Sequence, residues 1–240
     1  MPRKARIDAP GALHHIICRG IERGLIFQDN TDRDDFIKRL SAILSDTSTP
    51  CYAWALIPNH FHLLLRTGTE PIATVMRRLL TGYAISFNRR HHRHGHLFQN
   101  RYKSILCQED TYLIELVRYI HLNPLRAGLV QDLKELDYYA YSGHSRLMAK
   151  IKDQWQDVVT VLALFGKQKY AARKQYRVFV EKGILDGKKP ELTGGGLIRS
   201  AGGWGVLKSL GPHTGPTKLI NLFFLHNIKF NSLICPLCRY

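Results

Sequence analysis

Acidic residues are scarce in this chain of 240 residues. There are 19 Asp and Glu against 35 Lys and Arg, so the formal net charge is +16 and the isoelectric point lies near 9.8. No acid follows Glu191. Net charge does not decide a fold, but it does indicate which partners are attracted electrostatically. Nucleic acid is therefore the first partner that we expect, and an anionic membrane surface is the second.

Long hydrophobic runs and a cysteine framework are also missing. No run of 18 apolar residues occurs, which argues against a transmembrane helix, and the first eight residues lack the apolar stretch of a signal peptide. The five Cys show no framework spacing and fit reduced thiols. Cys235 and Cys238 make half of a zinc site at most. We therefore expect a cytoplasmic, nucleoid-associated protein without a membrane partner.

The order of sequence patterns predicts an α+β fold. Apolar and alternating stretches predict strands, and apolar residues at helical spacing behind cap residues predict helices. The elements are strands at 13–18, 51–57, 60–66 and 97–107, and helices from the cap cluster at 29–32, from Pro71 to Phe87 and over 110–122. The order is strand, helix, strand, strand, helix, strand, helix. This order is typical of a ferredoxin-like antiparallel sheet with packed helices.

Two shorter helical patterns follow between residues 155 and 185. A polar, Tyr-rich segment at 132–145 precedes them and is interpreted as a connection between domains. The second helical pattern, 167–182, is rich in Lys and Arg with interleaved aromatic residues. It fits a small DNA-contacting appendage and a solvated basic helix equally well. The chain shows no internal repeat.

Four polar residues point to chemistry. His60 and His62 are two apart in a predicted strand, so both imidazoles face the same side and could chelate one metal ion. Tyr119 and Asn123 are four apart, which places a hydroxyl and an amide on one helix face. His-x-His alone is weak in a chain with 12 His, and Asn123 before Pro124 also fits a helix C-cap, which is compatible with a ligand role.

The tyrosine has competitors. Leu113, Leu116, Val117 and Ile120 form the apolar stripe of the predicted helix, and Tyr119 lies off that stripe. A metal site beside a tyrosine in a basic protein suggests covalent chemistry on a phosphodiester. Tyr102 and Tyr112 are the alternative nucleophiles, and Tyr112 better fits a structural position.

Four sequence blocks carry a family resemblance. They are Pro58 to Leu64, Gly95 to Ser104, Arg118 to Ile120 and Asn123 to Val130. Their order and spacing resemble the REP-associated tyrosine transposases, relatives of the transposases that move single-stranded insertion sequences. The resemblance covers about residues 8 to 145 and is highly specific as a set.

The resemblance implies a function and its residues. It implies the HUH/Y1 ferredoxin-like architecture, with His60, His62 and Asn123 as ligands of Mg²⁺ or Mn²⁺ and with Tyr119 as the nucleophile. The activity would be that of an endonuclease and strand transferase that leaves a 5′-phosphotyrosine and a free 3′ hydroxyl. The partner would be single-stranded or hairpin DNA of the REP kind. A monomer and a homodimer both remain open, and so does the action of Tyr119 in its own chain or in a partner.

Basic residues are the candidates for DNA binding. The stretch 89–103 holds five Lys and Arg, four His and no acid, and phosphate contacts from such a stretch give affinity without sequence readout. A solvated basic face is the alternative. A basic arm at the start of the chain is a second candidate. The candidates are Arg89, Arg90, Arg93, Arg101 and Lys103, and in the arm Arg3, Lys4 and Arg6.

Three regions follow from these patterns. We predict a transposase-like catalytic domain at 1–145, a helical basic appendage at 146–190, and a C-terminal region at 191–240 that loses the resemblance after about residue 210. Two other functions remain possible. One is a non-catalytic regulator that binds DNA or RNA hairpins on the same fold. The other is an RNA-binding module, which ranks last because no aromatic ribonucleoprotein motif occurs.

Overall fold

A computed structural model describes residues 10–107, 109–153 and 155–185, all within the unit Met1–Leu192. The predicted basic arm and everything after residue 185 lie outside the described residues.

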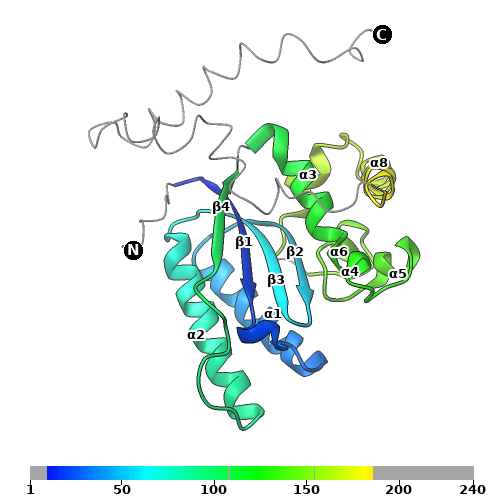
Figure 1. The fold of residues 1–240 in the computed structure, drawn as a ribbon. Coiled ribbons are helices and arrows are strands. Elements are labelled where there is room, and N and C mark those ends of the chain that lie inside the picture. Colours follow the sequence, from blue (N-terminus) through cyan, green and yellow to red (C-terminus); the bar gives the residue numbers. More distant parts are fainter. Residues whose placement is uncertain (1–9, 108, 154, 186–240) are drawn as a thin grey trace, which may run out of the picture. The chain divides into compact units, whose positions relative to one another are not determined.

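A four-stranded antiparallel sheet is at the centre of this unit (Figure 1). Its strands are β1 (Leu13–Arg19), β2 (Cys51–Ile57), β3 (His60–Arg66) and β4 (Lys103–Cys107), in the order β2-β3-β1-β4. The two-residue turn at Pro58 and Asn59 joins β2 to β3 as a hairpin. The predicted order of strands and helices is confirmed, and so is the α+β class.

One face of the sheet carries the apolar core. Helices α1 (Asn30–Asp46) and α2 (Ile72–Arg90) cover this face. The Asp29 side chain caps α1 by accepting a hydrogen bond of 3.1 Å from the Asp32 amide. The α2 stripe is buried as its spacing predicts, at Ile72, Val75, Met76, Leu79, Tyr83 and Phe87. Phe61, Leu63 and Leu65 of β3 meet these helices, because alternate side chains of a strand share a face.

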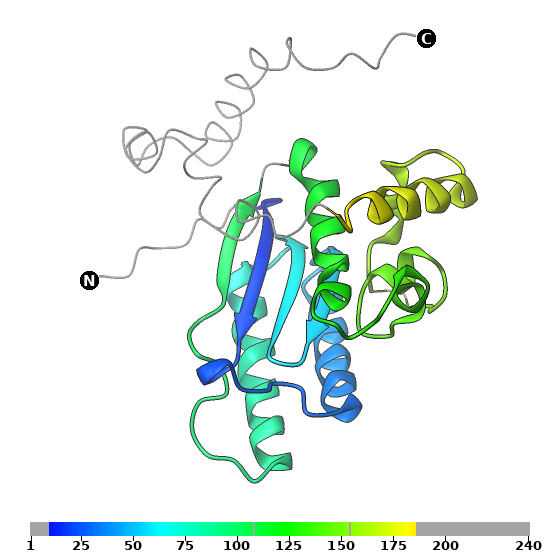
Figure 2. The same ribbon diagram turned by 45° about the vertical axis from the view of Figure 1, so that its right-hand side comes forward.

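Helices α3 (Glu109–His121) and α4 (Asn123–Arg126) lie on the opposite face of the sheet (Figure 2). Four of the α3 residues are buried as the apolar stripe predicts, at Leu113, Leu116, Val117 and Ile120. The short helices η1 (Ile21–Arg23), α5 (Leu133–Tyr138), α6 (His144–Leu147) and α7 (Val158–Ala163) complete the described part, together with α8 (Lys169–Lys182).

Two expectations need correction. The strand predicted at 97–107 begins only at Lys103. Its ladder with β1 ends at the pair of Lys103 and Ile17, although β1 continues to Arg19. Beyond that pair the contacts are irregular: the Gln99 amide donates to the Arg19 carbonyl, the Ile21 amide donates to the Leu97 carbonyl, and Gly20 bridges to Phe98. Leu97 is nevertheless buried, since an apolar run reports burial rather than strand pairing.

The Tyr-rich segment at 132–145 is the second correction. It forms α5, and its backbone then pairs with β2: the Gly143 amide donates to the Trp54 carbonyl at 2.9 Å, and Ser142 bridges to Ala55. The segment is therefore packed on the sheet edge, which a sequence pattern without long-range partners could not reveal.

Candidate active site

The strand pairing brings three histidines to the face that α3 covers. His60 and His62 of β3 point to the same side, as the alternation predicts, and they pair with Arg19 and Ile17 of β1. His15 lies two residues before Ile17 and shares that face. The ring centroids of His60 and His62 are 5.1 Å apart, which is compatible with two imidazoles on one cation.

His15 is a member of the site that the sequence reading missed. Its Nε2 lies 3.0 Å from Nδ1 of His62, and the two rings stack with centroids 5.3 Å apart. Both residues are buried, with 0% and 3% of their surface exposed. The contact engages Nδ1 of His62, so Nε2 is the nitrogen that a metal ion would use.

His60 is held in a corresponding way. Its Nδ1 lies 2.7 Å from the amide oxygen of Asn59, in the turn before β3. An amide oxygen can only accept, so Nδ1 carries the proton and Nε2 keeps its lone pair. Burial, with the charge of Arg19 added, lowers the pKa of His60 to about 4. Burial and then the neighbouring His15 lower the pKa of His62 well below its ordinary value. Both imidazoles are therefore neutral at pH 7, as metal ligation requires.

Tyr119 faces this cluster from α3. Its ring centroid is 5.8 Å from that of His62 and 6.0 Å from that of His15, both edge-on. Burial raises the pKa of Tyr119, and the Arg126 guanidinium, whose carbon lies 5.4 Å from the ring centroid, acts in the opposite direction. The hydroxyl alone is therefore a poor nucleophile at neutral pH and depends on neighbouring positive charge.

Asn123 closes the end of the helix. Its Nδ2 donates to the carbonyls of Tyr119 at 2.9 Å and of Ile120 at 3.2 Å, so the C-cap contact expected for this residue is present. Helix α3 ends at His121 and Asn123 opens α4, so the side chain reaches Tyr119 across a helix junction rather than along one helix. These bonds use the amide nitrogen, whereas a metal ligand would use the oxygen.

The donor set fits a divalent ion of intermediate hardness. Among the residues that the structure describes, no three His, Cys, Asp or Glu side chains group together as a metal site. The candidate set is instead two imidazoles and one amide, which leaves coordination positions for phosphate oxygens. Mixed nitrogen and oxygen donors suit Mn²⁺ well and Mg²⁺ less ideally.

The alternative tyrosines are less suitable. Tyr102 is 5% exposed and packs with the core between the sheet and the α1 and α2 helices, on the opposite face from the histidines. The side chain of Tyr112 lies outside the described residues.

The predicted DNA-binding residues divide into two kinds. Arg90 is an ion-pair partner of Asp29 and Asp32, at 2.5 Å from each, and thereby joins the end of α2 to the start of α1. Arg89, Arg101 and Lys103 are exposed.

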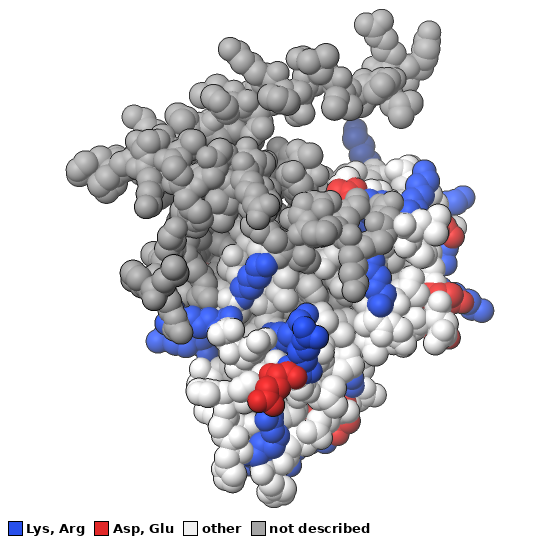
Figure 3. Space-filling model, viewed as in Figure 1, with Lys and Arg blue, Asp and Glu red and all other residues white. Residues whose placement is uncertain are grey.

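Several Lys and Arg side chains are visible in the view of Figure 3. They form separate patches on the described residues, and acidic side chains lie beside some of them. Arg19, which the sequence reading did not single out, is exposed directly opposite His60. The feature that identifies Arg19 is the pairing register of β1 with β3, which places it opposite His60.

A comparison with protein families matches the part of the chain that carries these residues. Residues 10–123 match the model of the family described as "Transposase IS200 like". The matched segment includes both histidines of β3, Tyr119 and Asn123.

One solved structure has a similar fold. A REP-associated tyrosine transposase bound to a REP hairpin is similar with a TM-score of 0.50 and 16% identity, over 65% of this chain and 94% of that one. A crystal structure of a Deinococcus radiodurans protein described as a transposase also matches. Its TM-score is 0.35 and its sequence identity is 21%, over 50% of this chain and 95% of that one. No curated protein matches the chain. No helix among the described residues is long and apolar enough to cross a membrane.

Proposed function

We propose that the chain is a metal-dependent tyrosine endonuclease and strand transferase that acts on single-stranded or hairpin DNA. The observation that carries this proposal is the position of Tyr119, edge-on to His62 with ring centroids 5.8 Å apart, over two neutral imidazoles. The match of residues 10–123 to the IS200-like family model supports DNA cleavage. The hairpin in the structure of the similar REP-associated transposase supports the choice of partner.

His60, His62 and Asn123 would hold Mg²⁺ or Mn²⁺. The chemistry that such an ion supplies is polarisation of the scissile phosphate and compensation of charge on the leaving 3′ oxygen. His15 would accept a hydrogen bond from Nδ1–H of His62, which leaves the His62 Nε2 lone pair for the ion.

The Tyr119 oxygen would attack phosphorus while the bond to the 3′ oxygen breaks. The tyrosine loses its proton and the departing 3′ oxygen gains one, so the products are a 5′-phosphotyrosine and a free 3′ hydroxyl. Arg126, over the Tyr119 ring, favours the phenolate through its charge. The phosphotyrosine keeps the energy of the broken bond, so attack by a 3′ hydroxyl reverses the step and joins strands.

The direct test is incubation of the protein with 5′- and 3′-labelled hairpin DNA and Mn²⁺, followed by a denaturing gel. We expect a covalent adduct that carries the label of the 3′ fragment, because that fragment keeps the 5′ phosphate. Tight hairpin binding without any adduct would instead support the non-catalytic regulator.

A further inference from the structure

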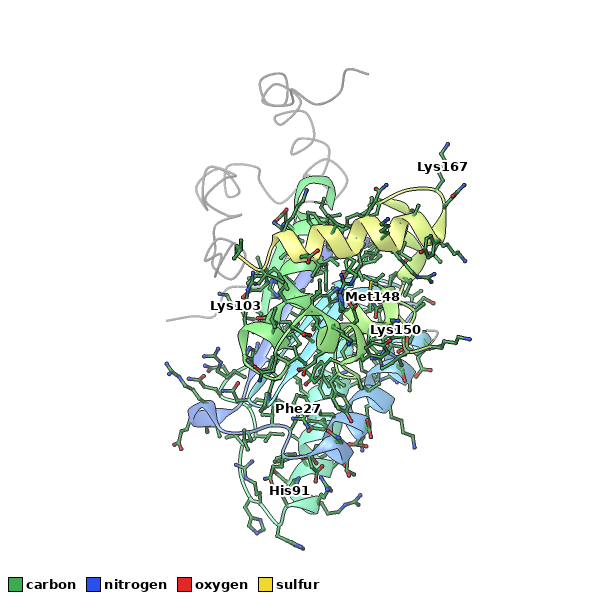
Figure 4. All side chains as sticks on the ribbon, turned by 90° about the vertical axis from the view of Figure 1, so that its right-hand side faces the viewer. Phe27, His91, Lys103, Met148, Lys150 and Lys167 are labelled. Atoms are coloured by element: carbon green, nitrogen blue, oxygen red, sulfur yellow. The ribbon has the colours of Figure 1, made fainter. Side chains whose placement is uncertain are left out.

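Helix α8 contacts the segment that carries Tyr119 on both sides of that residue. The guanidinium carbon of Arg118 lies 4.3 Å from the centroid of the Phe179 ring. Arg126 of α4 donates to the carbonyl of Gly183, which caps α8, at 3.3 Å. Helix α8 therefore contacts Arg118 and Arg126, which lie before and after the candidate nucleophile in the sequence. We call the side of α8 that makes these contacts its inner face. Figure 4 shows α8 lying across α3, with Lys167 before its start pointing outward.

Between these two contacts lies a buried chain of hydrogen bonds. The Tyr176 hydroxyl of α8 is 2.8 Å from Nδ1 of His121 and 2.7 Å from Nδ1 of His144. Nε2 of His144 is 2.8 Å from a carboxylate oxygen of Asp137, whose other oxygen accepts from Arg177 at 2.9 Å. Tyr176, His121 and His144 have 0% of their surface exposed.

Only one direction of donation satisfies the chain with neutral imidazoles. The Asp137 carboxylate accepts from Nε2–H of His144, so Nδ1 of His144 must accept from the Tyr176 hydroxyl. The Tyr176 oxygen then accepts from Nδ1–H of His121, at the last turn of α3. Each proton in this series of hydrogen bonds thus has one defined position. All the hydrogen bonds from His121 to Asp137 therefore run in the same donor-to-acceptor direction.

Two glycines permit this close approach. A Cβ at Gly183 would lie 2.5 Å from Cδ of Arg118, and a Cβ at Gly143 would lie 2.7 Å from Nε2 of His121. Neither contact leaves room for a side chain. The inner face of α8 and the start of α6 are therefore fitted to α3 at the residues next to Tyr119.

We propose that α8 is part of the catalytic unit and that Tyr176 is a positioning residue. Through His121 it holds the end of α3 so that Tyr119 faces the histidine pair of β3. The proposal rests on the function proposed above for Tyr119. It assigns the inner face of α8 to catalysis and leaves its outer lysines out of the chemical step.

Tyr176→Phe is the first test, because it removes the bridging hydroxyl and keeps the ring. Tyr170→Phe is the matched control, since Tyr170 lies on the same helix and is 84% exposed. We expect single-turnover adduct formation to slow by at least about tenfold in Tyr176→Phe, while hairpin Kd and Mn²⁺ affinity stay within about twofold, as a lost transition-state contact predicts. Tyr170→Phe should match the parent protein. An unchanged adduct rate in Tyr176→Phe would overturn the proposal.

His121 provides the rescue test. His121→Asn keeps an N–H donor near the place of Nδ1, whereas His121→Leu removes it. We expect His121→Asn to form adduct faster than His121→Leu at equal folded fraction. Equal rates would contradict a role for the hydrogen bond and would leave only packing.

Hydrogen exchange separates this proposal from the proposed function. Amides of α3 should exchange faster in Tyr176→Phe than in the parent, with α1 amides unchanged. This readout needs no adduct, so it remains informative even if the parent protein proves inactive. Exchange in α3 that is unchanged, or that rises equally in α1, would contradict the positioning role. If Tyr176→Phe does not fold, Arg118→Lys removes the planar stacking on Phe179 and keeps the charge, and the same results are expected.

Discussion

The two faces of the sheet do different work, although the same strands supply both. In β3, Phe61, Leu63 and Leu65 enter the apolar core with α1 and α2. His60, before Phe61, and His62, after it, point to the other face, where the His62 ring lies edge-on to the Tyr119 ring of α3. One face of β3 therefore carries the apolar core and the other carries the candidate active site. A shift of the pairing register by one residue would exchange the two faces.

The difference also concerns the cost of burial. Apolar side chains gain free energy when they leave water, whereas His15 and His62 lose the hydration of their charged forms. The structure compensates this loss by keeping the imidazoles neutral and bonded to each other. The histidine face is therefore stabilised only while these groups are unprotonated, and the opposite face has no such condition.

The largest expected effect lies on the chemical face. Tyr119→Phe removes only a hydroxyl and keeps the ring beside His62, so the covalent adduct should disappear while hairpin affinity stays within a few-fold. A denaturing gel and a binding titration on the same preparation measure both. Persistence of the adduct would reject Tyr119 and make Tyr112 the next candidate, because Tyr102 lies in the core on the other side of the sheet.

His62→Ala should also prevent cleavage, because one imidazole and an amide hold a divalent ion poorly. Hairpin binding should survive, since the phosphate contacts lie elsewhere. Calorimetric titration with Mn²⁺ in the absence of DNA is the independent readout. Unchanged Mn²⁺ affinity in both His60→Ala and His62→Ala would remove the metal-site assignment.

Phe61→Ala tests the neighbouring position on the opposite face. Phe61 is 0% exposed and contacts the ring of Phe36 of α1, with centroids 4.8 Å apart. Truncation should therefore lower the free energy of unfolding by about 3–5 kcal/mol. Urea unfolding measures this loss, and Mn²⁺ affinity of the folded fraction should be unchanged. A loss of stability in His62→Ala as large as in Phe61→Ala would break the distinction between the two faces.

Much of the fold was predictable because its signals are local. The alternation in β3 and the stripe of α2 depend on residues a few positions apart. The fourth strand was predicted to begin at residue 97 instead of at Lys103, because a buried loop and a strand can have similar local composition. The start of β4 is set by its pairing with β1, which begins at the pair of Lys103 and Ile17, and no local pattern contains this long-range pairing.

The site shows the same division. His60, His62, Tyr119 and Asn123 were predicted from spacing and resemblance. The structure places the Tyr119 ring beside His62 and bonds Asn123 to the Tyr119 carbonyl, while their roles in catalysis and metal binding stay predictions. The role of His15 was not predictable, since it contacts a residue 47 positions away through the pairing of β1 with β3. The link from His121 to Tyr176 spans 55 positions and has no sequence pattern of its own.

Stability should fall on acidification because of the buried histidines. The pKa values of His60, His62, His121 and His144 are lowered by burial, that of His60 to about 4. The unfolded chain binds protons near pH 6.5, whereas the native state stays neutral. The stabilising effect is therefore complete above about pH 6.5 and is lost as the pH falls toward the lowered native values, with a slope of at most about 5 kcal/mol per pH unit.

Urea unfolding at pH 7.5, 6.5 and 5.5 measures this dependence. Replacing His62 by Gln should reduce the slope, because one group no longer titrates in the unfolded chain. A stability that is constant across this range would contradict the neutral, buried state of the histidine face.

The smallest expected effect concerns the basic stretch 89–103. Hairpin affinity should fall with salt, and losing two phosphate contacts in an Arg89→Ala, Arg93→Ala double variant should flatten the slope of log K against log salt by about 1.4–1.8.

Arg90→Ala is the matched control from the same stretch. Its guanidinium is held by Asp29 and Asp32, and the latter is 2% exposed. This variant should therefore lose stability, because a buried carboxylate loses one of its charged partners, and should change the salt slope less. If Arg90→Ala flattens the slope as much as the double variant, the ion pairs open on binding. If neither changes it, the stretch is a solvated face, and the positive charge that meets DNA lies on the histidine side, with Arg19 as the first residue to replace.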